Sequence, residues 1–291
     1  MSMENIPLQE IRGAAAPDVA MESSAIEKQR RLLASLRELD GLLVALSGGA
    51  DSAYLAWAAD LALGARGLAV TALSASFSRH DREQTEAFVH STGIRHEFIS
   101  TEEFANPLYV ANQADRCYHC KDELFERMQT LARERQFAAI AYGINADDTR
   151  DFRPGHRAAK ERRILAPLLD AHLGKQEIRL LSRRAGLTTW DRPASACLSS
   201  RVPYGTPVTP EILAKIERGE AALRDLGFRQ FRVRAHGELA RIELAQEELA
   251  RGQQPEMAES IAVHVKDAGF SLVTIDPQGY RQGSLNSLLK K

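Results

Sequence analysis

Short apolar runs alternate with helical segments along the first 186 residues. We expect strands at 42–46, 68–77, 95–100 and 137–145, of which LLVAL at 42–46 is continuously apolar. Such runs are typical of parallel strands, because helices cover both faces of a parallel sheet. The segments that lie around these strands have helical spacing, namely 25–40, 53–64, 81–92, 120–136 and 166–186. The alternation predicts an α/β fold with a doubly wound parallel sheet.

The segment 189–210 breaks this alternation, because it carries four prolines. We take it as a junction to a second, smaller α/β unit. That unit is expected to contain a helix at 210–226, two strands around the His236-Gly237 turn, helices at 245–251 and 255–268, and a strand at 270–276. The chain is therefore divided into a poorly ordered lead-in at 1–24, a larger domain at 25–190 and a smaller domain at 191–291.

Length and composition agree with two ordinary globular domains. The chain has 291 residues, 44% of them hydrophobic, and a formal net charge of -1. The near-neutral charge argues against charge-driven binding of nucleic acid, and the lack of a long apolar run argues against a membrane span. The opening residues do not resemble a secretory signal, and three cysteines are an odd, small number. We therefore expect a cytoplasmic protein.

The sharpest motif is the loop Ser47-Gly48-Gly49-Ala50-Asp51-Ser52 between a strand and a helix. Glycines let the backbone approach a ligand, and the following helix directs its free N–H groups at an anion in the turn. Ser47 and Ser52 can donate to phosphate oxygens. The loop has no lysine and does not match the Walker pattern. A serine-capped turn without a ligand is the alternative interpretation for SGG alone.

The whole pattern resembles the PP-loop of the ATP pyrophosphatases, a family with an adenine-nucleotide hydrolase-like fold. The resemblance implies that Ser47, Gly48, Gly49 and Ser52 hold the β and γ phosphates of ATP, which leave as pyrophosphate. It places Asp51 near the phosphates and their Mg²⁺, since a carboxylate without a metal would repel them. Ser74, at the end of the second strand, and Gly143 would complete the ATP site, because ligands bind at the carboxyl ends of strands in such sheets.

The segment Arg116-Cys117-Tyr118-His119-Cys120-Lys121 places a CxxC just before a helix, and Cys197 follows later in the proline-rich segment. A helix N-terminus and nearby cations favour the thiolate. A zinc half-site, a redox pair and three thiolates of a [4Fe-4S] cluster with one open iron are the functional alternatives. Incidental cysteines near a helix start are the remaining interpretation.

Five motifs together resemble a narrower family, LarE, over about residues 25–275. They are the PP-loop, RCYHCK, GINADD at 143–148, PASACLSSRVPYG at 193–205 and RVRAHGELARIE at 232–243. The resemblance implies an ATP-dependent sulfur transferase. Its substrate would be a pyridinium dicarboxylate mononucleotide, and its product the thiocarboxylate precursor of a nickel-pincer cofactor. The resemblance also implies a homo-oligomer.

Two sulfur sources occur in that family. Some members give up the sulfur of one cysteine, whereas others hold a [4Fe-4S] cluster on three cysteines and bind sulfide at its open iron. This chain has Cys117, Cys120 and Cys197 and no other cysteine. We favour the cluster, because it can turn over repeatedly while a sacrificed Cys197 cannot. In both cases Cys197, Asp51 and Arg201 are the expected catalytic residues.

The substrate side is assigned to polar residues of the later motifs. Arg201, Arg232 and Arg234 are candidate phosphate clamps, because arginine pairs with phosphate and carboxylate in a planar, bidentate geometry. Arg232 and Arg234 lie two apart on an expected strand and so share a face, which could also be a plain solvated face. The other candidates are Ser200, Glu220 and Asp148; Glu220 could bind a metal, orient the substrate or lie on the surface.

Three other kinds of protein share some of these features. A tRNA-modifying PP-loop enzyme would have the same loop, but it should show a basic surface or an RNA-binding domain. Amidating synthetases with this loop do not explain the cysteines. A nucleotide-binding regulatory module without turnover does not explain the intact loop together with the Cys197 segment. We therefore expect a small-molecule nucleotide substrate and no nucleic-acid or membrane partner.

Overall fold

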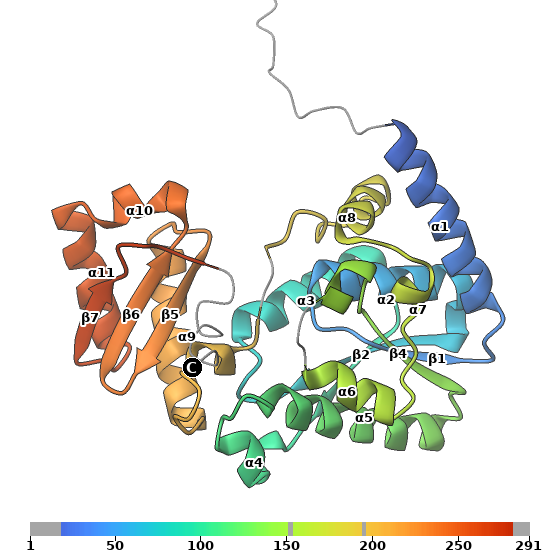
Figure 1. The fold of residues 1–291 in the computed structure, drawn as a ribbon, viewed down its shortest axis with the longest axis horizontal. Helices are drawn as coiled ribbons and strands as arrows, with labels where there is room; N and C mark the ends of the chain where they lie inside the picture. The colour runs from blue at the N-terminus through green and yellow to red at the C-terminus, as the bar shows by residue number, and fades with distance from the viewer. Residues whose placement is uncertain (1–18, 151–153, 194–195, 282–291) are drawn as a thin grey trace, which may run out of the picture.

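The computed structural model describes residues 19–150, 154–193 and 196–281, which form two α/β units (Figure 1). The larger unit is built on a four-stranded parallel sheet with the strand order β3-β2-β1-β4. Its strands are β1 (Leu42–Ala45), β2 (Gly67–Leu73), β3 (His96–Ser100) and β4 (Ala139–Tyr142). The predicted parallel sheet is confirmed, and the order of its strands changes direction between β1 and β4.

Helices cover both faces of this sheet (Figure 1). One layer contains α1 (Val19–Arg37), α2 (Ala50–Leu63), α3 (Arg79–Thr92), α7 (Pro167–Asp170) and α8 (Lys175–Arg184). The other layer contains α5 (Arg116–Arg135) and α6 (Pro154–Glu161). The short helix α4 (Pro107–Val110) precedes α5. The alternation of the sequence therefore produces three layers, as in other doubly wound folds.

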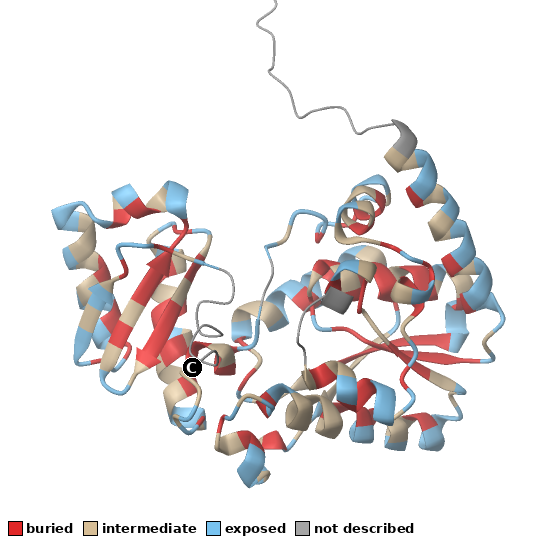
Figure 2. Cartoon of the chain, in the orientation of Figure 1, coloured by how far each residue is buried: buried red, intermediate tan, exposed pale blue. Residues whose placement is uncertain are grey.

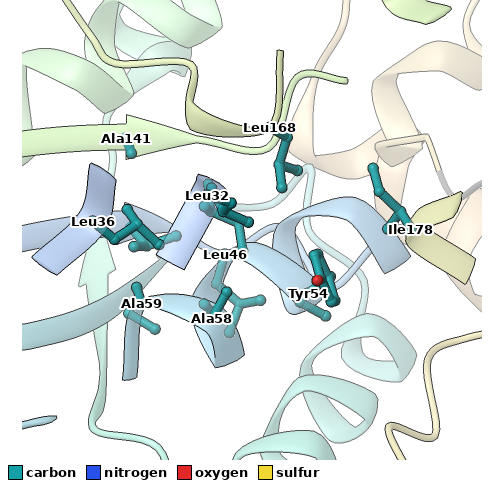
Figure 3. Packing of buried hydrophobic residues seen from close by; sticks show 14 of the residues in the cluster. Leu32, Leu36, Leu46, Tyr54, Ala58, Ala59, Ala141, Leu168 and Ile178 are labelled. Atoms are coloured by element: carbon teal, nitrogen blue, oxygen red, sulfur yellow. The ribbon is translucent and has the colours of Figure 1, made fainter. Parts of the chain in front are cut away.

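Alternate residues of the strands feed two separate hydrophobic clusters, because successive side chains point to opposite faces. Val44 packs into the cluster under α1 and α2, whereas Leu43 packs into the one under α5. Figure 3 shows part of the first cluster, which includes Leu32 of α1, Leu46 and Leu168 of α7. Both strand faces are buried, which accounts for the continuous apolar run at 42–46 (Figure 2).

The smaller unit has a three-stranded mixed sheet. Its elements are α9 (Pro210–Asp225), β5 (Phe231–His236), β6 (Leu239–Leu244), α10 (Gln246–Gly252), α11 (Pro255–Asp267) and β7 (Leu272–Ile275). The hairpin β5–β6 is antiparallel and β7 pairs with β6 in parallel. Its core also takes in Tyr109 of α4 and Leu198 of the junction. The two units therefore share apolar contacts through segments that belong to neither sheet.

Several boundaries differ from the sequence prediction. The first helix begins at Val19, six residues before the expected start, so part of the supposed lead-in is helical; residues 1–18 lie outside the described residues. The second strand ends at Leu73, because the side chains that follow bond to Glu103. The loop expected between 145 and 166 contains α6. The helix expected at 166–186 is divided into α7 and α8, with His172 in the left-handed region at φ 56° between them.

Among the helices that the structure describes, none combines the length and the apolar character needed to cross a membrane.

The docking of α1 can be tested by shortening one buried side chain. Leu32 has no exposed surface, so Leu32→Ala should lower the free energy of unfolding by about 2–5 kcal/mol. Leu61→Ala is the matched control, because Leu61 is 54% exposed on α2 and should change stability by only about 0.5 kcal/mol. Urea denaturation measures both values. Equal midpoints for the two variants would contradict this packing.

Candidate active site

The loop between β1 and α2 is held by its own serines. The Ser47 hydroxyl lies 3.0 Å from the Ser52 hydroxyl, and the Ser52 hydroxyl accepts from the Ser47 N–H and donates to the Gly49 carbonyl. Gly48 has φ +77°, which a residue with a side chain rarely adopts. A Cβ at this position would lie 2.9 Å from the Thr85 hydroxyl oxygen. The loop is therefore a compact turn at the N-terminus of α2, which is a favourable place for an anion.

Gly143, directly after β4, allows a second close approach. A Cβ at Gly143 would lie 2.7 Å from the Ser52 nitrogen and 2.8 Å from the Ser52 Cα. Real side chains do not tolerate such distances to backbone atoms. The carboxyl end of β4 can therefore lie against the first turn of α2 only with glycine at this position, which brings the motif 143–148 beside the loop.

Polar side chains from both segments meet at this point. Asn145 donates to one oxygen of Asp51 at 3.1 Å, and its N–H donates to Asp148 at 3.3 Å. The other Asp51 oxygen, Oδ1, is buried without a hydrogen-bond partner in the described structure. Burial raises the pKa of Asp51; Lys175 lowers it and Asp148 raises it further. Two carboxylates beside a phosphate-type loop, one with a free oxygen, match the oxygen ligands that Mg²⁺ prefers.

An open cavity of about 380 Å³ lies at the end of β2 and the start of α3. It is lined by Leu73, Ser74, Phe77, Ser78, Arg79 and Arg82. The Ser74 hydroxyl donates to the buried Glu103 carboxylate at 2.5 Å, and the Ser76 hydroxyl does so at 3.1 Å. The cavity lies at the carboxyl end of β2, the strand next to β1, where the sequence analysis placed Ser74 in the expected ATP site.

The three cysteines lie on two segments that approach one another. Cys117 and Cys197 are exposed and Cys120 is half-buried. Arg116 donates to the Ser199 carbonyl at 2.7 Å and so ties the start of α5 to the segment that carries Cys197. Burial raises the pKa of the Cys120 thiol, and the nearby charges of Cys197 and Glu103 raise it further.

Two sequence expectations are corrected at this point. The CxxC does not precede the helix but occupies its first turns, since α5 begins at Arg116. The thiolate of Cys120 is disfavoured rather than favoured, because its burial outweighs the opposing effect of Lys121.

Thiols are the donor type that iron–sulfur clusters take, and the three cysteines lie on two segments that are linked by Arg116. Within the described ranges, however, no three His, Cys, Asp or Glu side chains are placed closely enough to hold one metal ion. The thiols fit a cluster in kind and neighbourhood, while their spacing here is not that of a formed metal cage.

Arg201 and Glu220 form a buried ion pair between the junction and α9. The guanidinium bonds to both carboxylate oxygens at 2.8 and 3.0 Å, and the two side chains are 4% and 8% exposed. Arg201 also donates to the Cys197 carbonyl at 3.0 Å and to the Ser200 hydroxyl at 3.0 Å. Glu220 accepts a further bond from the Val233 N–H. These contacts fix the backbone around Cys197; Ala194 and Ser195 lie outside the described residues.

Arg232 and Arg234 lie on β5. Arg234 pairs with the fully buried Glu243 of β6 at 2.8 Å and donates to the Ser200 carbonyl at 2.9 Å. The Arg232 guanidinium lies 5.1 Å from the ring centre of Tyr280, and burial lowers its pKa, with the nearby Arg201 charge acting in the same direction. The arginines expected on the substrate side therefore gather next to the Cys197 segment, and Arg201 and Arg234 are already paired with carboxylates.

The structure brings the predicted residues into two neighbouring groups. The loop group consists of Ser47, Gly48, Gly49, Asp51, Ser52, Gly143 and Asp148. The junction group consists of Cys197, Ser200, Arg201, Glu220, Arg232 and Arg234. Ser74 bonds to Ser76, and the Ser76 carbonyl accepts from the Leu198 N–H at 2.9 Å, which connects Ser74 to the junction.

Sequence reasoning missed Glu103, Arg116, Lys175 and Arg192 as candidate residues of this region. Glu103 is 3% exposed and its Oε2 has no partner among the described residues. The only signal for Glu103 was an acidic residue soon after the third strand. Arg116 stood in the quoted cysteine motif but was given no role of its own, and Lys175 starts a helix that carried no other motif.

The buried Asp51 carboxylate should cost stability. Its pKa is raised in the folded state, so folding is disfavoured by its ionisation, and this cost appears as the pH rises from below 3.8 through the folded-state value. Asp51→Asn should therefore raise the Tm at pH 7 in the absence of nucleotide and Mg²⁺. The gain should shrink as the pH falls. A scanning calorimetry series measures this dependence, and a Tm gain that grows on acidification would contradict it.

The Arg201–Glu220 pair should behave as a buried ion pair. Arg201→Met leaves the Glu220 carboxylate without its partner, and Glu220→Gln leaves the Arg201 charge without its partner. Each variant should lower the free energy of unfolding by about 3–5 kcal/mol, and the double variant Arg201→Met/Glu220→Met should recover part of this loss. Urea denaturation gives the coupling energy. Arg135→Ala, which removes an exposed pair with Glu97, is the matched control and should cost less than about 1 kcal/mol. Single variants as stable as this control would show that the pair is not buried in solution.

Comparisons with known proteins agree with this geometry. A sequence model of the NAD synthase family matches residues 27–148, which contain the loop and the β4 motif. An uncharacterized protein of Synechocystis sp. is 42% identical over 271 residues, 93% of this chain and 100% of that protein. Pyridinium-3,5-bisthiocarboxylic acid mononucleotide synthase of Lactiplantibacillus plantarum is 32% identical over 265 residues, 91% of this chain and 95% of that enzyme. With these matches and a PP-loop at the switch point of its sheet, the chain belongs to the LarE family of PP-loop ATP pyrophosphatase sulfur transferases.

Proposed function

We propose that this protein uses ATP to adenylate a carboxylate of a pyridinium dicarboxylate mononucleotide and then replaces AMP by sulfur. The product is a thiocarboxylate on the route to a nickel-pincer cofactor. The observation that carries the proposal is the direct link between the nucleotide side and the thiol side. The Leu198 N–H, next to Cys197, donates to the Ser76 carbonyl at 2.9 Å, and Ser76 lies beside the cavity residue Ser74.

ATP binding is supported by the loop group. The N-terminus of α2 and the hydroxyls of Ser47 and Ser52 face the β and γ phosphates, and the cavity at Ser74 takes the adenine. Asp51 and Asp148 would hold Mg²⁺, for which the partnerless Asp51 oxygen is a suitable ligand. The metal would supply charge neutralisation at the phosphates. Asn145 orients Asp51 for this role through its hydrogen bond.

The substrate carboxylate oxygen attacks the α-phosphorus, and the bond to the β-phosphate oxygen breaks, so pyrophosphate leaves. The protein contributes mainly by holding the two reactants in line and by stabilising phosphate charge. Arg232 belongs to the junction group and is the candidate for the substrate phosphate. Arg201, Arg234, Glu220 and Ser200 shape the site through their mutual bonds and hold the backbone next to Cys197.

Two sulfur donors fit the reaction. In one, the Cys197 thiolate attacks the acyl carbon and AMP leaves as a thioester forms. Loss of the Cys197 Cα proton and cleavage of its Cβ–S bond then leave the thiocarboxylate and dehydroalanine. In the other, Cys117, Cys120 and Cys197 would hold a [4Fe-4S] cluster, which would supply a bound sulfide. Three thiols in one neighbourhood favour the second donor, because sacrifice of Cys197 requires neither Cys117 nor Cys120.

We also propose a division of roles between the two domains. Residues 25–190 act as the ATP domain, and residues 191–291 act as the domain that binds the substrate and assembles the homo-oligomer.

The first test identifies the products. The purified protein with ATP, Mg²⁺ and the pyridinium dicarboxylate mononucleotide should form AMP and pyrophosphate, and Asp51→Ala should reduce the rate by at least about a hundredfold. Glu134→Ala, a substitution at an exposed site on α5, is the control and should retain activity. Release of ADP and phosphate would contradict the scheme. Turnover with bulk tRNA in place of the mononucleotide would favour a tRNA-modifying enzyme.

The second test separates the sulfur donors. Anaerobic purification with iron and sulfide analysis should give about four irons per chain. The iron should be lost when any one of Cys117, Cys120 or Cys197 is replaced by alanine. If no iron binds and Cys197 is consumed instead, mass spectrometry after turnover should show a chain lighter by one H₂S, while Cys117→Ala and Cys120→Ala keep single-turnover activity.

A further inference from the structure

Arg192 connects the phosphate loop to the start of α3. Its Nη1 donates to the Gly48 carbonyl at 2.6 Å, and its Nη2 donates to the Asp81 carboxylate at 2.7 Å. The two side chains are only 13% and 17% exposed, so the pair is shielded from water. The Arg192 backbone carbonyl in turn accepts from Arg179 of α8 at 2.9 Å. Arg192 is thus held both by its backbone and by its guanidinium.

The bond to Gly48 fixes the orientation of one peptide group in the loop. The described residues contain no cis peptide bond, so the peptide between Gly48 and Gly49 is trans. In a trans peptide the C=O and N–H groups point in opposite directions. Because the Gly48 carbonyl points at Arg192, the Gly49 N–H points away from it. Gly49 is the N-cap of α2, so its N–H directly precedes the first N–H groups of that helix. Those groups have no partner within the helix and are the ones available to a phosphate.

Asp81 is a fixed anchor rather than a mobile surface carboxylate. Its second oxygen accepts from the Ser78 hydroxyl at 2.7 Å, and that hydroxyl accepts from the Asp81 N–H at 3.0 Å, so the carboxylate belongs to the cap of α3. The guanidinium between Asp81 and Gly48 therefore has little freedom to rotate.

We propose that Arg192, anchored by Asp81, is a positioning residue that orients the Gly48–Gly49 peptide so that the Gly49 N–H faces the phosphates of ATP. The inference rests on the proposed binding of ATP at this loop. The loop 47–52 contains no lysine or arginine of its own. Arg192 acts on the conformation of the loop through its bond to the Gly48 carbonyl. Because Arg192 lies five residues before Cys197, the same contact fixes the start of the thiol-bearing segment relative to the loop.

The sign of one substitution separates positioning from simple charge attraction. If Arg192 attracted ATP only by its charge, removal of the Asp81 carboxylate would strengthen ATP binding, because a negative charge near the phosphates would disappear. If Arg192 acts by positioning, removal of its anchor weakens ATP binding despite the more favourable charge. Glu83→Ala removes an exposed carboxylate from the same helix and is the matched control for the charge effect.

The test measures binding of the non-hydrolysable analogue α,β-methylene-ATP with Mg²⁺ to the full-length protein by calorimetry. Arg192→Ala and Asp81→Ala should each weaken binding by about tenfold or more, the size expected for a lost charged hydrogen bond. The double variant should be no weaker than either single variant, because the two residues act as a unit. Glu83→Ala should leave binding unchanged or slightly tighter.

Tighter binding by Asp81→Ala, or additive losses in the double variant, would overturn the inference. Asp81→Asn and Arg192→Lys keep part of the contacts and should fall between the wild type and the alanine variants, which keeps the test valid if an alanine variant unfolds. Since the readout is binding and not turnover, failure of the proposed sulfur transfer would leave this result interpretable. Absence of analogue binding by the wild type would overturn both proposals.

Discussion

The buried pair of Arg201 and Glu220 is the interaction on which the arrangement of the two units depends. One guanidinium bonds to both oxygens of a carboxylate on α9 and to three groups of the Cys197 segment, namely the Ala196 and Cys197 carbonyls and the Ser200 hydroxyl. A buried ion pair offsets the cost of its desolvation only if its other hydrogen-bonding atoms also have partners. Here the Glu220 carboxylate also accepts from the Val233 N–H of β5. The pair thus fixes the backbone of residues 197–201, which lies between the nucleotide side and the smaller sheet.

A second constraint places the other candidate site residues near this segment. In a parallel sheet the carboxyl ends of all strands lie on one edge. The order β3-β2-β1-β4 changes direction between β1 and β4, which is where sheets of this kind bind ligands. The loop after β1, the motif after β4 and the cavity after β2 all lie at this edge. The junction follows from α8 and reaches the same edge through the bond between Leu198 and Ser76. Thiols and nucleotide loop are therefore neighbours although Ser47 and Cys197 are far apart in the sequence.

The fold was largely predictable because its strongest signals are local. Residues 42–64 contain all three signals in succession: a continuously apolar run, a glycine turn and a segment with helical spacing. The errors fall where tertiary contacts decide the structure. Residues 19–24 are helical because this part of α1 packs beside α8, where Glu22 pairs with Arg184. The second strand ends early because the hydroxyls of Ser74 and Ser76 donate to the Glu103 carboxylate. Glu103 and Arg192 carried no motif, so only the three-dimensional structure could place them beside the loop and the thiols.

Asp51 shows why the predicted site residues are costly as well as recognisable. A buried carboxylate with one oxygen lacking a partner in the described structure is less stable than a neutral amide would be, and burial has already raised its pKa. Natural proteins keep such groups where a ligand compensates for them. A divalent cation at Asp51 would replace the missing partner and reverse the penalty, so nucleotide and metal would stabilise the same loop that they use. Glu103, which is buried with one partnerless oxygen near the thiols, poses the same physical problem on the sulfur side.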